Sequence, residues 1–328
     1  MSPSAAAPEP DGLPPWVEPQ LATLTKDRFS DPAWIFERKL DGERCLAFRG
    51  QSRGVRLLTR NQHDITGTFS EIAAALDAQR ADGFIVDGEI VAFADGQTRF
   101  EMLQHRLGVA HPEPALVDGF PVFYYIFDVL YADGRDMRPQ PELARKRLLV
   151  ETLSFAGPLR YTDYREGDGE AFYRSACRQG WEGLIAKRAD APYLAGRSRN
   201  WLKFKCLAGQ EFVIGGYTDP RRSRQGFGAL LLGYYDADGR LTYAGKVGTG
   251  FDDRTLHSLR ATLGTLERDT PAFDRGNPPR AGVHWVEPRL VGQIAFAEWT
   301  DDNLLRQPRF QGLREDKDAA DVVREIPQ

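Results

Sequence analysis

The sequence lacks long apolar runs and an excess of either charge. No stretch approaches the roughly 20 apolar residues that a membrane span needs, so we expect no membrane association. The 43 lysines and arginines stand against 47 aspartates and glutamates, a net charge of −4, which argues against a protein that coats nucleic acid by bulk charge. With 41% hydrophobic and 27% charged residues among 328, the composition is that of a globular protein of about two domains.

Cysteine is also scarce. Cys45, Cys177 and Cys206 are widely spaced and form no CxxC pair, so we expect each to serve packing in a reduced, cytoplasmic protein. The five histidines show no spacing typical of metal ligands. Residues 1–15 lack the basic and apolar segments of a secretory signal, and their proline and alanine content predicts a disordered leader.

A first domain is expected over residues 16–207. Alternating or buried apolar patterns predict strands at 33–40, 44–50, 54–61, 121–131, 183–188 and 200–206. Residues 84–93 are predicted to form two half-strands around Asp87-Gly88. Helical periodicity predicts helices at 69–79, 99–108, 143–153 and 170–180.

The pattern changes in residues 208–328. Short strands separated by glycine and Asp-Gly turns follow one another, with one predicted helix at 252–267. About five short strands and one helix in some 120 residues are typical of a small barrel of the OB type. The chain is therefore predicted to be an α+β protein of two domains.

Two pairs of charged residues sit on predicted strands. Glu37 and Lys39 are two residues apart, as are Lys203 and Lys205, so each pair shares one sheet face. Lysines on an otherwise apolar strand face need anionic partners if they are buried. The alternative for each lysine is a solvated surface group.

Two carboxylates lie next to glycines near predicted strand ends. Glu89 follows Gly88, and Glu182 precedes Gly183. Carboxylates in such places suit a divalent cation that bridges phosphate oxygens. The alternative for both is a surface turn.

Seven short motifs in order raise the specificity of these observations. They are KLDGER at 39–44, TRN at 59–61, DGE at 87–89, YYIFDVLY at 124–131, EGLIAKR at 182–188, WLKFK at 201–205 and REDK at 314–317. On these motifs, residues 16 to 325 resemble the ATP-dependent DNA ligases of the covalent nucleotidyltransferase superfamily, and most of all the ligase module of bacterial ligase D. The resemblance implies an antiparallel-sheet adenylation domain of the ATP-grasp-like DNA ligase fold, followed by an OB-fold barrel.

The resemblance also implies a role for each motif residue. Lys39 attacks the α-phosphorus of ATP and becomes lysyl-AMP, which passes to the 5′-phosphate of a nick and is displaced by the 3′-hydroxyl. Nucleotide contacts are implied for Glu37 (adenine), Phe127 (stacking on adenine, or else a core phenylalanine), Glu89 (ribose), Arg44 and Arg60 (ribose or phosphate), Lys203 and Lys205 (α-phosphate), and Arg314 and Lys317 (pyrophosphate). Glu182 and Glu89 are the implied ligands of Mg²⁺ or Mn²⁺.

The nucleophile must be neutral, whereas a free lysine has a pKa of about 10.4. We expect Arg44, Lys203, Lys205 and a metal ion to crowd Lys39 and to lower its pKa to roughly 7–8. The same cations would offset charge on the phosphorus in the transition state.

Two basic segments are candidates for DNA contacts. Arg221, Arg222 and Arg224 share a loop between predicted strands, where the alternative is a solvated turn. Six cations also fall within 19 residues, and they are Lys187, Arg188, Arg197, Arg199, Lys203 and Lys205.

Other functions share parts of this pattern. An RNA ligase or an mRNA-capping guanylyltransferase shares KxDG and the paired lysines, but the tail from 296 to 317 favours DNA ligation. An NAD-dependent enzyme is not expected, because only 38 residues precede Lys39. A purely DNA-binding module would need no nucleophilic lysine.

The implied substrate is nicked double-stranded DNA, in repair or end joining. We expect a monomer in the bacterial cytoplasm, associated with the nucleoid when on DNA. The sequence leaves open whether Ku and a repair polymerase are partners, and which metal ion is preferred.

Overall fold

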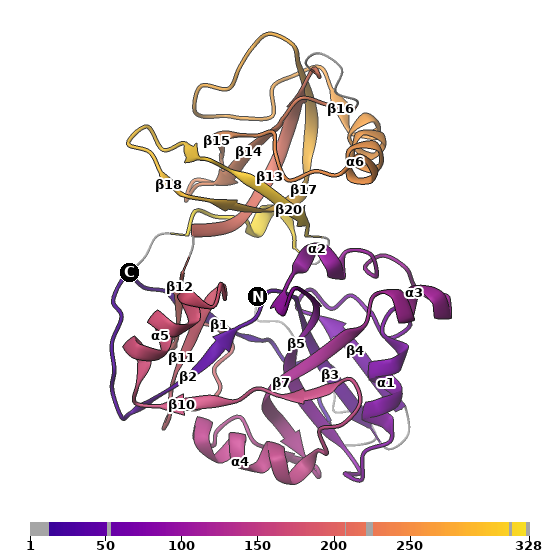
Figure 1. Ribbon diagram of the computed structural model, residues 1–328, viewed down its shortest axis with the longest axis vertical. Coiled ribbons are helices and arrows are strands. Elements are labelled where there is room, and N and C mark those ends of the chain that lie inside the picture. Colours follow the sequence, from indigo (N-terminus) through magenta and orange to yellow (C-terminus); the bar gives the residue numbers. More distant parts are fainter. Residues whose placement is uncertain (1–12, 51–53, 207, 221–225, 315–316, 326–328) are drawn as a thin grey trace. The chain divides into compact units, whose positions relative to one another are not determined.

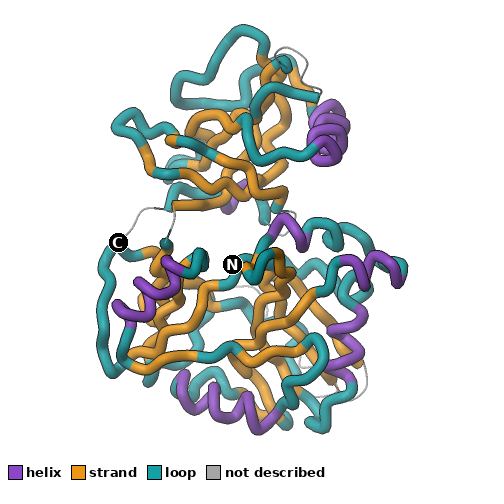
Figure 2. Tube along the Cα trace, in the orientation of Figure 1, coloured by secondary structure: helices purple, strands orange, loops and turns teal. Residues whose placement is uncertain are grey.

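The computed structural model describes residues 13–50, 54–206, 208–220, 226–314 and 317–325. They fall into two compact units, one of residues 13–206 and one of residues 208–325. Strands dominate both units, as Figure 2 shows. None of the helices in these ranges is long and apolar enough to cross a membrane.

The first unit contains two sheets with helices on their outer faces (Figure 1). Its elements are β1 (Gln20–Leu24), β2 (Trp34–Lys39), β3 (Glu43–Gly50), β4 (Gly54–Thr59), α1 (Ser70–Asp77), β5 (Phe84–Ala94), β6 (Gln97–Thr98), α2 (Phe100–Leu103), α3 (Pro114–Gly119), β7 (Val122–Ala132), β8 (Arg135–Asp136), α4 (Glu142–Thr152), β9 (Leu159–Tyr161), β10 (Tyr164–Glu166), α5 (Gly169–Arg178), β11 (Gly183–Arg188) and β12 (Gly196–Lys205).

A five-stranded sheet has the order β1-β12-β11-β2-β10. On β2, β11 and β12, one face carries the even-numbered apolar residues Trp34, Phe36, Leu184, Ala186, Leu202 and Phe204. Phe36, Leu184 and Phe204 are fully buried there against Phe172 and Ala176 of α5. Because one face is committed to this core, the odd-numbered residues of the same strands point to the opposite face.

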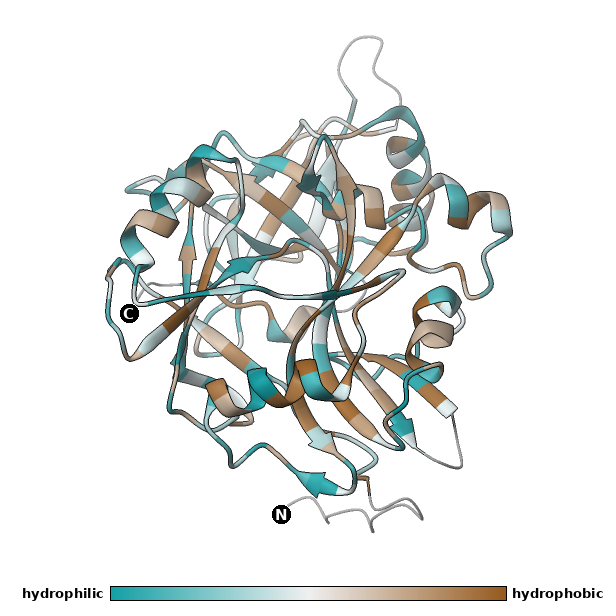
Figure 3. Ribbon diagram, turned by 60° about the horizontal axis from the view of Figure 1, so that its bottom comes forward, coloured by the Kyte–Doolittle hydropathy of each residue, from teal (hydrophilic) through white to brown (hydrophobic). Residues whose placement is uncertain are grey.

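A second, mainly antiparallel sheet has the order β4-β3-β5-β7-β8, with β6 on β5 and β9 on β7. One of its faces packs against α1 and α4, through Ile72 and Leu149 among others. Its other face meets the five-stranded sheet, because Leu46 of β3 and Trp201 of β12 belong to one buried cluster. Figure 3 shows the apolar strand residues in brown. The odd-numbered face of β2, β11 and β12 therefore lies toward this second sheet.

The second unit is an OB-fold barrel. Its elements are β13 (Ala208–Thr218), β14 (Leu230–Tyr235), β15 (Leu241–Val247), α6 (Asp253–Thr265), β16 (Glu267–Arg268), β17 (Val283–Phe296), β18 (Glu298–Trp299), β19 (Leu305–Arg306), β20 (Arg309–Leu313) and the 3₁₀ turn η1 (Ala319–Asp321). The main sheet has the order β15-β14-β13-β17-β16, with β20 on β17. Helix α6 begins where Asp252 Oδ1 accepts a hydrogen bond from the Thr255 amide at 2.7 Å, and it buries Leu256, Leu259 and Leu263 in the barrel core.

Two predicted elements differ from those observed. Residues 84–93 do not form two half-strands, because β5 runs through Asp87-Gly88 with only a shift in register against β7. The helix predicted at 99–108 is shorter, since α2 ends at Leu103 and turns follow it.

The prediction that all three cysteines serve packing is wrong for two of them. Cys177 at the end of α5 and Cys206 after β12 form a disulfide, with Cα atoms 5.3 Å apart. Cys45 is a free, buried cysteine. Sequence spacing did not indicate the pair, because α5 and β12 come together only when the helix packs on the even-numbered face of the sheet.

Candidate active site

The site is built on the odd-numbered face of β2, β11 and β12. Three successive rows cross these strands, and they are Lys39–Gly183–Lys205, Glu37–Ile185–Lys203 and Ile35–Lys187–Trp201. The fold thus brings together both charged pairs predicted from the sequence, although about 160 residues separate them along the chain.

Gly183 occupies the centre of the first row. It has a φ of +152°, and a Cβ there would collide with the carbonyl oxygen of Phe204. Glycine is therefore required by the backbone. Gly183 itself therefore contributes no side chain between Lys39 and Lys205.

Lys39 ends β2 and is paired with a carboxylate. Its Nζ lies 2.5 Å from Glu182 Oε2, and the two side chains are 21% and 25% exposed. Burial works to lower the pKa of Lys39, but the surrounding carboxylates, Glu182 above all, hold that pKa above its ordinary value. Glu89 and Asp41 also raise the pKa of Lys39.

The lowered pKa expected for Lys39 is therefore wrong for the protein without ligands. The sequence showed the cations near Lys39 but not the distance to Glu182. In this state Lys39 is protonated at neutral pH and cannot act as a nucleophile. Activation has to come from whatever neutralises the carboxylates.

Glu89 lies on β5 and supports the turn that follows Lys39. Its Oε1 accepts a hydrogen bond from the Gly42 amide at 3.2 Å. A Cβ on Gly42 would collide with the carbonyl oxygen of Ile90, so the turn packs tightly against β5. This contact places a second carboxylate beside Lys39.

Arg44 is held by Asp87, which is not among the predicted site residues. Its Nε and Nη2 donate to Asp87 at 2.5 and 2.6 Å, and Tyr193 donates to the same carboxylate at 2.6 Å. Asp87 is fully buried and raises the pKa of Arg44 against the opposing effect of burial. Any contact of Arg44 with a nucleotide therefore falls to Nη1.

Phe127 is a core residue in this structure. It is 8% exposed, and its ring lies under Arg44 and Lys187, with 4.6 Å from each charged group to the ring centre. Trp201 meets it edge-on at 6.0 Å. The alternative of a core phenylalanine thus describes its environment, and stacking on adenine stays a prediction.

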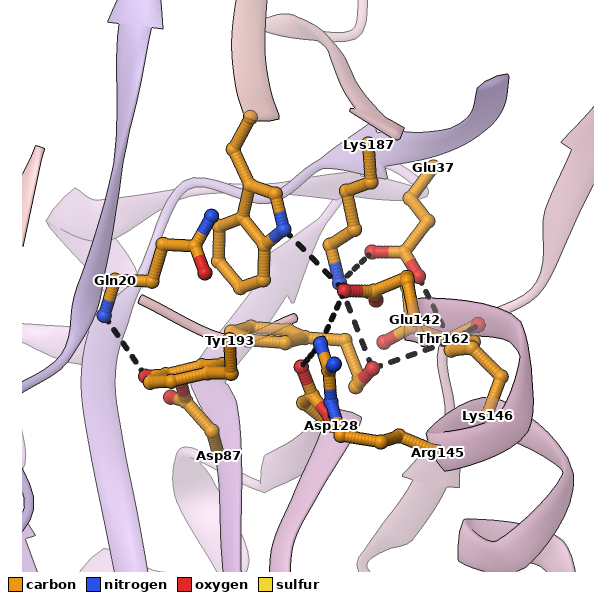
Figure 4. Close-up of polar contacts among 12 residues, drawn as sticks. Gln20, Glu37, Asp87, Asp128, Glu142, Arg145, Lys146, Thr162, Lys187 and Tyr193 are labelled. Atoms are coloured by element: carbon orange, nitrogen blue, oxygen red, sulfur yellow. Dashed lines mark hydrogen bonds and ion pairs between the residues drawn. The ribbon is translucent and has the colours of Figure 1, made fainter. Parts of the chain in front are cut away.

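A buried network of three acids and three bases includes one residue of the second row and one of the third (Figure 4). Its members share side-chain exposures of 3% or less, and they are Glu37, Asp128, Glu142, Arg145, Lys146 and Lys187. The formal charges cancel. The network ties β2, β7, α4 and β11 together.

Sequence reasoning missed most of this network. Helix α4 was predicted, but its buried residues are Glu142, Arg145, Lys146 and Leu149. They follow the spacing i, i+3, i+4, i+7 of a buried helix face. One acid and two bases at that spacing were the available indication of a buried ionic face.

The proposed cluster of six cations for DNA is wrong in part. Lys187 is 1% exposed and pairs with Glu37 and Glu142 at 2.9 Å each. Arg188 pairs with Asp190 at the surface. Lys187 is therefore an interior residue and does not contact DNA phosphates.

The remaining predicted residues lie elsewhere. Arg60 follows directly on β4, and Arg314 follows β20 in the second unit. Lys317, in the same unit, lies 3.3 Å from Glu211. Arg221, Arg222 and Arg224 fall outside the described residues.

The carboxylates beside Lys39 fit a hard divalent cation. Glu182 and Glu89 offer oxygen ligands, which Mg²⁺ and Mn²⁺ prefer. Within the described ranges, no three His, Cys, Asp or Glu side chains form a metal cluster. Two carboxylates with phosphate oxygens completing the shell are typical of nucleotide-bound magnesium.

We expect Glu182→Gln to make the Lys39 amine more reactive. Loss of the carboxylate removes the main group that holds the pKa of Lys39 up, and each unit of pKa is about tenfold in neutral amine. Amine-specific labelling at pH 8, followed by peptide mass spectrometry, measures it without nucleotide or metal. Glu166→Gln, an exposed change on β10, is the control. Equal labelling of Lys39 in the wild-type protein and both variants would contradict the effect assigned to Glu182.

The comparisons with known proteins agree with this geometry. The model of the ATP dependent DNA ligase domain matches residues 19–205, and that of the ATP dependent DNA ligase C terminal region matches residues 223–317. The chain therefore belongs to the ATP-dependent DNA ligase family, with an adenylation domain followed by an OB-fold domain.

Two curated relatives are named as end-joining proteins, and one solved ligase structure also matches the chain. The multifunctional non-homologous end joining protein LigD of Pseudomonas aeruginosa is 38% identical over 323 residues, covering 96% of this chain and 37% of that protein. Its counterpart in Mycobacterium tuberculosis is 36% identical over 315 residues, covering 94% and 40%. A solved structure of mycobacterial DNA ligase D with ATP and MES matches with a TM-score of 0.68 and 34% identity, covering 94% of this chain and 98% of that chain. The chain thus spans well under half the length of these curated relatives.

Proposed function

We propose that the chain seals nicks in duplex DNA through an adenylate carried on Lys39. The Nζ of Lys39 attacks the α-phosphorus of ATP, and the bond to the leaving pyrophosphate breaks. An oxygen of the DNA 5′-phosphate then displaces Lys39 from AMP. Finally the 3′-hydroxyl attacks that 5′-phosphate, AMP leaves, and the strand is joined.

The observation that carries this proposal is the first row of the sheet face. Lys39 and Lys205 flank Gly183, so a phosphate group over the glycine meets the nucleophile on one side and a cation on the other. Lys203 stands on the same face one row away. Cations arranged before the reaction offset charge on the phosphorus without reorganisation.

Glu182 and Glu89 provide a way to control the protonation of Lys39. A divalent cation held by Glu182 and Glu89 would supply positive charge next to the phosphate oxygens. With those carboxylates engaged, Lys39 would lose the partner that keeps it protonated, and its amine could release the proton to water before attack.

The biological setting is proposed from the relatives. Two of them are named as non-homologous end joining proteins, so we propose a role in DNA end joining, with Ku and a repair polymerase as candidate partners. We also propose that the protein acts in the cytoplasm as a monomer. The DNA contacts of residues 221–224 belong to the same proposal.

The nucleotide used separates the competing functions. The protein is incubated with α-labelled ATP, GTP or NAD labelled in its AMP moiety, together with Mg²⁺ or Mn²⁺, and is then denatured. We expect a covalent adduct from ATP alone, and none after chelation of the metal. An adduct from GTP would favour a capping enzyme, and one from NAD would favour the NAD-dependent ligases.

Arg314 and Lys317 are expected to serve the first step. If they orient pyrophosphate, replacing both with alanine should slow adenylation of Lys39 by at least about tenfold, while joining of a pre-adenylated nick stays near the wild-type rate. Single-turnover assays of the two steps make the comparison. Equal losses in both assays would refute the division of roles.

A further inference from the structure

Glu37 is held by two ammonium groups from different elements. The Nζ of Lys146, on α4, lies 2.8 Å from Glu37 Oε1, and the Nζ of Lys187 lies 2.9 Å from Oε2. Lys146 is itself fixed, because it donates to the Thr162 carbonyl at 2.7 Å and lies 4.3 Å from the ring centre of Tyr161. Glu37 cannot turn without leaving a buried ammonium group unpaired (Figure 4).

This arrangement is a costly way to stabilise a core. Burial lowers the pKa of Lys146 although Glu37 faces it. Buried ion pairs are often no more stable than apolar residues of the same shape. Glu37 Oε1, moreover, is buried and accepts no hydrogen bond within the described residues beyond its ion contact. The network therefore fixes the position of Glu37 and favours its charged, carboxylate form.

The position of Glu37 on β2 places it on the same sheet face as the nucleophile. Glu37 and Lys39 lie on one face of β2, two residues and roughly 7 Å apart. A nucleotide with its α-phosphate at Lys39 can therefore bring its base toward Glu37. On that base edge, adenine presents an amine donor at N6, whereas guanine presents a carbonyl acceptor at O6.

We propose that Lys146 is a positioning residue for base selection. It keeps Glu37 a carboxylate in a fixed position, which accepts a hydrogen bond from an exocyclic amine of the base and repels a carbonyl oxygen. The inference rests on the proposed function, in which Glu37 faces the base of ATP. A carboxylate only accepts hydrogen bonds, whereas a protonated or turned Glu37 can offer an O–H to guanine. A neutral Glu37 would also leave two buried ammonium groups with one counterion fewer. Lys146 thus opposes both ways of accepting GTP.

The test measures covalent nucleotidylation with ATP and with GTP. In Lys146→Met the ratio of kcat/KM for ATP over GTP should fall at least about tenfold, mainly through KM for ATP, because Lys39 and its phosphate contacts are unchanged. Leu149→Ala, fully buried on the same helix but outside the network, is the matched control. It should lower Tm and leave the ratio near the wild-type value.

A second variant separates selection from folding. Glu37→Gln with Lys146→Met restores the charge balance, so Tm should rise above that of Lys146→Met alone. The ATP preference should stay low, because glutamine can donate to guanine O6. The inference is overturned if Lys146→Met keeps the wild-type ratio, if Leu149→Ala lowers the ratio equally, or if the double variant restores it. A wild-type protein that forms no adduct with any nucleotide would overturn the proposed function and this inference with it.

Discussion

Replacing Lys39 with alanine should abolish adenylation and the joining of nicks that carry a plain 5′-phosphate. The alanine has no nucleophile to carry AMP, so the single-turnover rate with ATP should fall by at least about a thousandfold. The fold should survive, because the Lys39–Glu182 pair is partly exposed and worth about 1 kcal/mol or less. Gel assays of labelled protein and labelled nick measure both rates.

The same variant should still join a nick that is already adenylated. In that step the 3′-hydroxyl attacks the 5′-phosphate and AMP leaves, so no bond to Lys39 forms or breaks. We expect joining of the pre-adenylated nick to remain measurable, within about a hundredfold of wild type, since only charge near the phosphate is lost. Loss of this activity together with adenylation would mean that the change disrupts the site as a whole.

Replacing Arg145 with methionine should destabilise the first unit more than any surface change. Arg145 is fully buried and donates to both oxygens of Asp128 at 2.8 Å each, and to Glu142 at 2.6 Å. Its removal leaves two buried carboxylates short of a cation. Breaking a buried pair in this way typically costs about 3–5 kcal/mol. Urea unfolding measures the change in the free energy of unfolding.

A surface arginine provides the matched control. Arg138 makes a comparable two-point contact with Asp136, but the side chains are 35% and 36% exposed. Arg138→Met should therefore cost about 1 kcal/mol or less. If both variants lost similar stability, burial would not be what makes the loss of Arg145 costly. If Arg145→Met lost nothing, its carboxylate partners would be neutral.

The charged face of the five-stranded sheet could be predicted from the sequence because strand side chains alternate. Spacing alone put Glu37 with Lys39 and Lys203 with Lys205, and the family resemblance joined the two pairs. The sheet confirms the arrangement, since Gly183 lies between Lys39 and Lys205. The α+β class with an OB-fold barrel is likewise confirmed.

What could not be predicted depends on partners far apart in the chain. Burial works to lower the pKa of Lys39, but the carboxylates raise it, first among them Glu182, which lies 143 residues away, so counting cations near the motif gave the wrong direction. The helix containing Arg145 and Lys146 was predicted, yet its ionic face is buried because acids on β2 and β7 meet it. The disulfide between Cys177 and Cys206 likewise depends on the packing of α5 against the sheet.

The most direct test of the account is the position of the adenylate. The protein is incubated with ATP and Mg²⁺, denatured and digested, and its peptides are analysed by mass spectrometry. We predict AMP on the peptide that contains Lys39, joined to that side chain through a bond that is stable to base and labile to acid. AMP on another residue, or nick joining by wild-type protein with no adenylate on Lys39 at any time, would contradict the central claim.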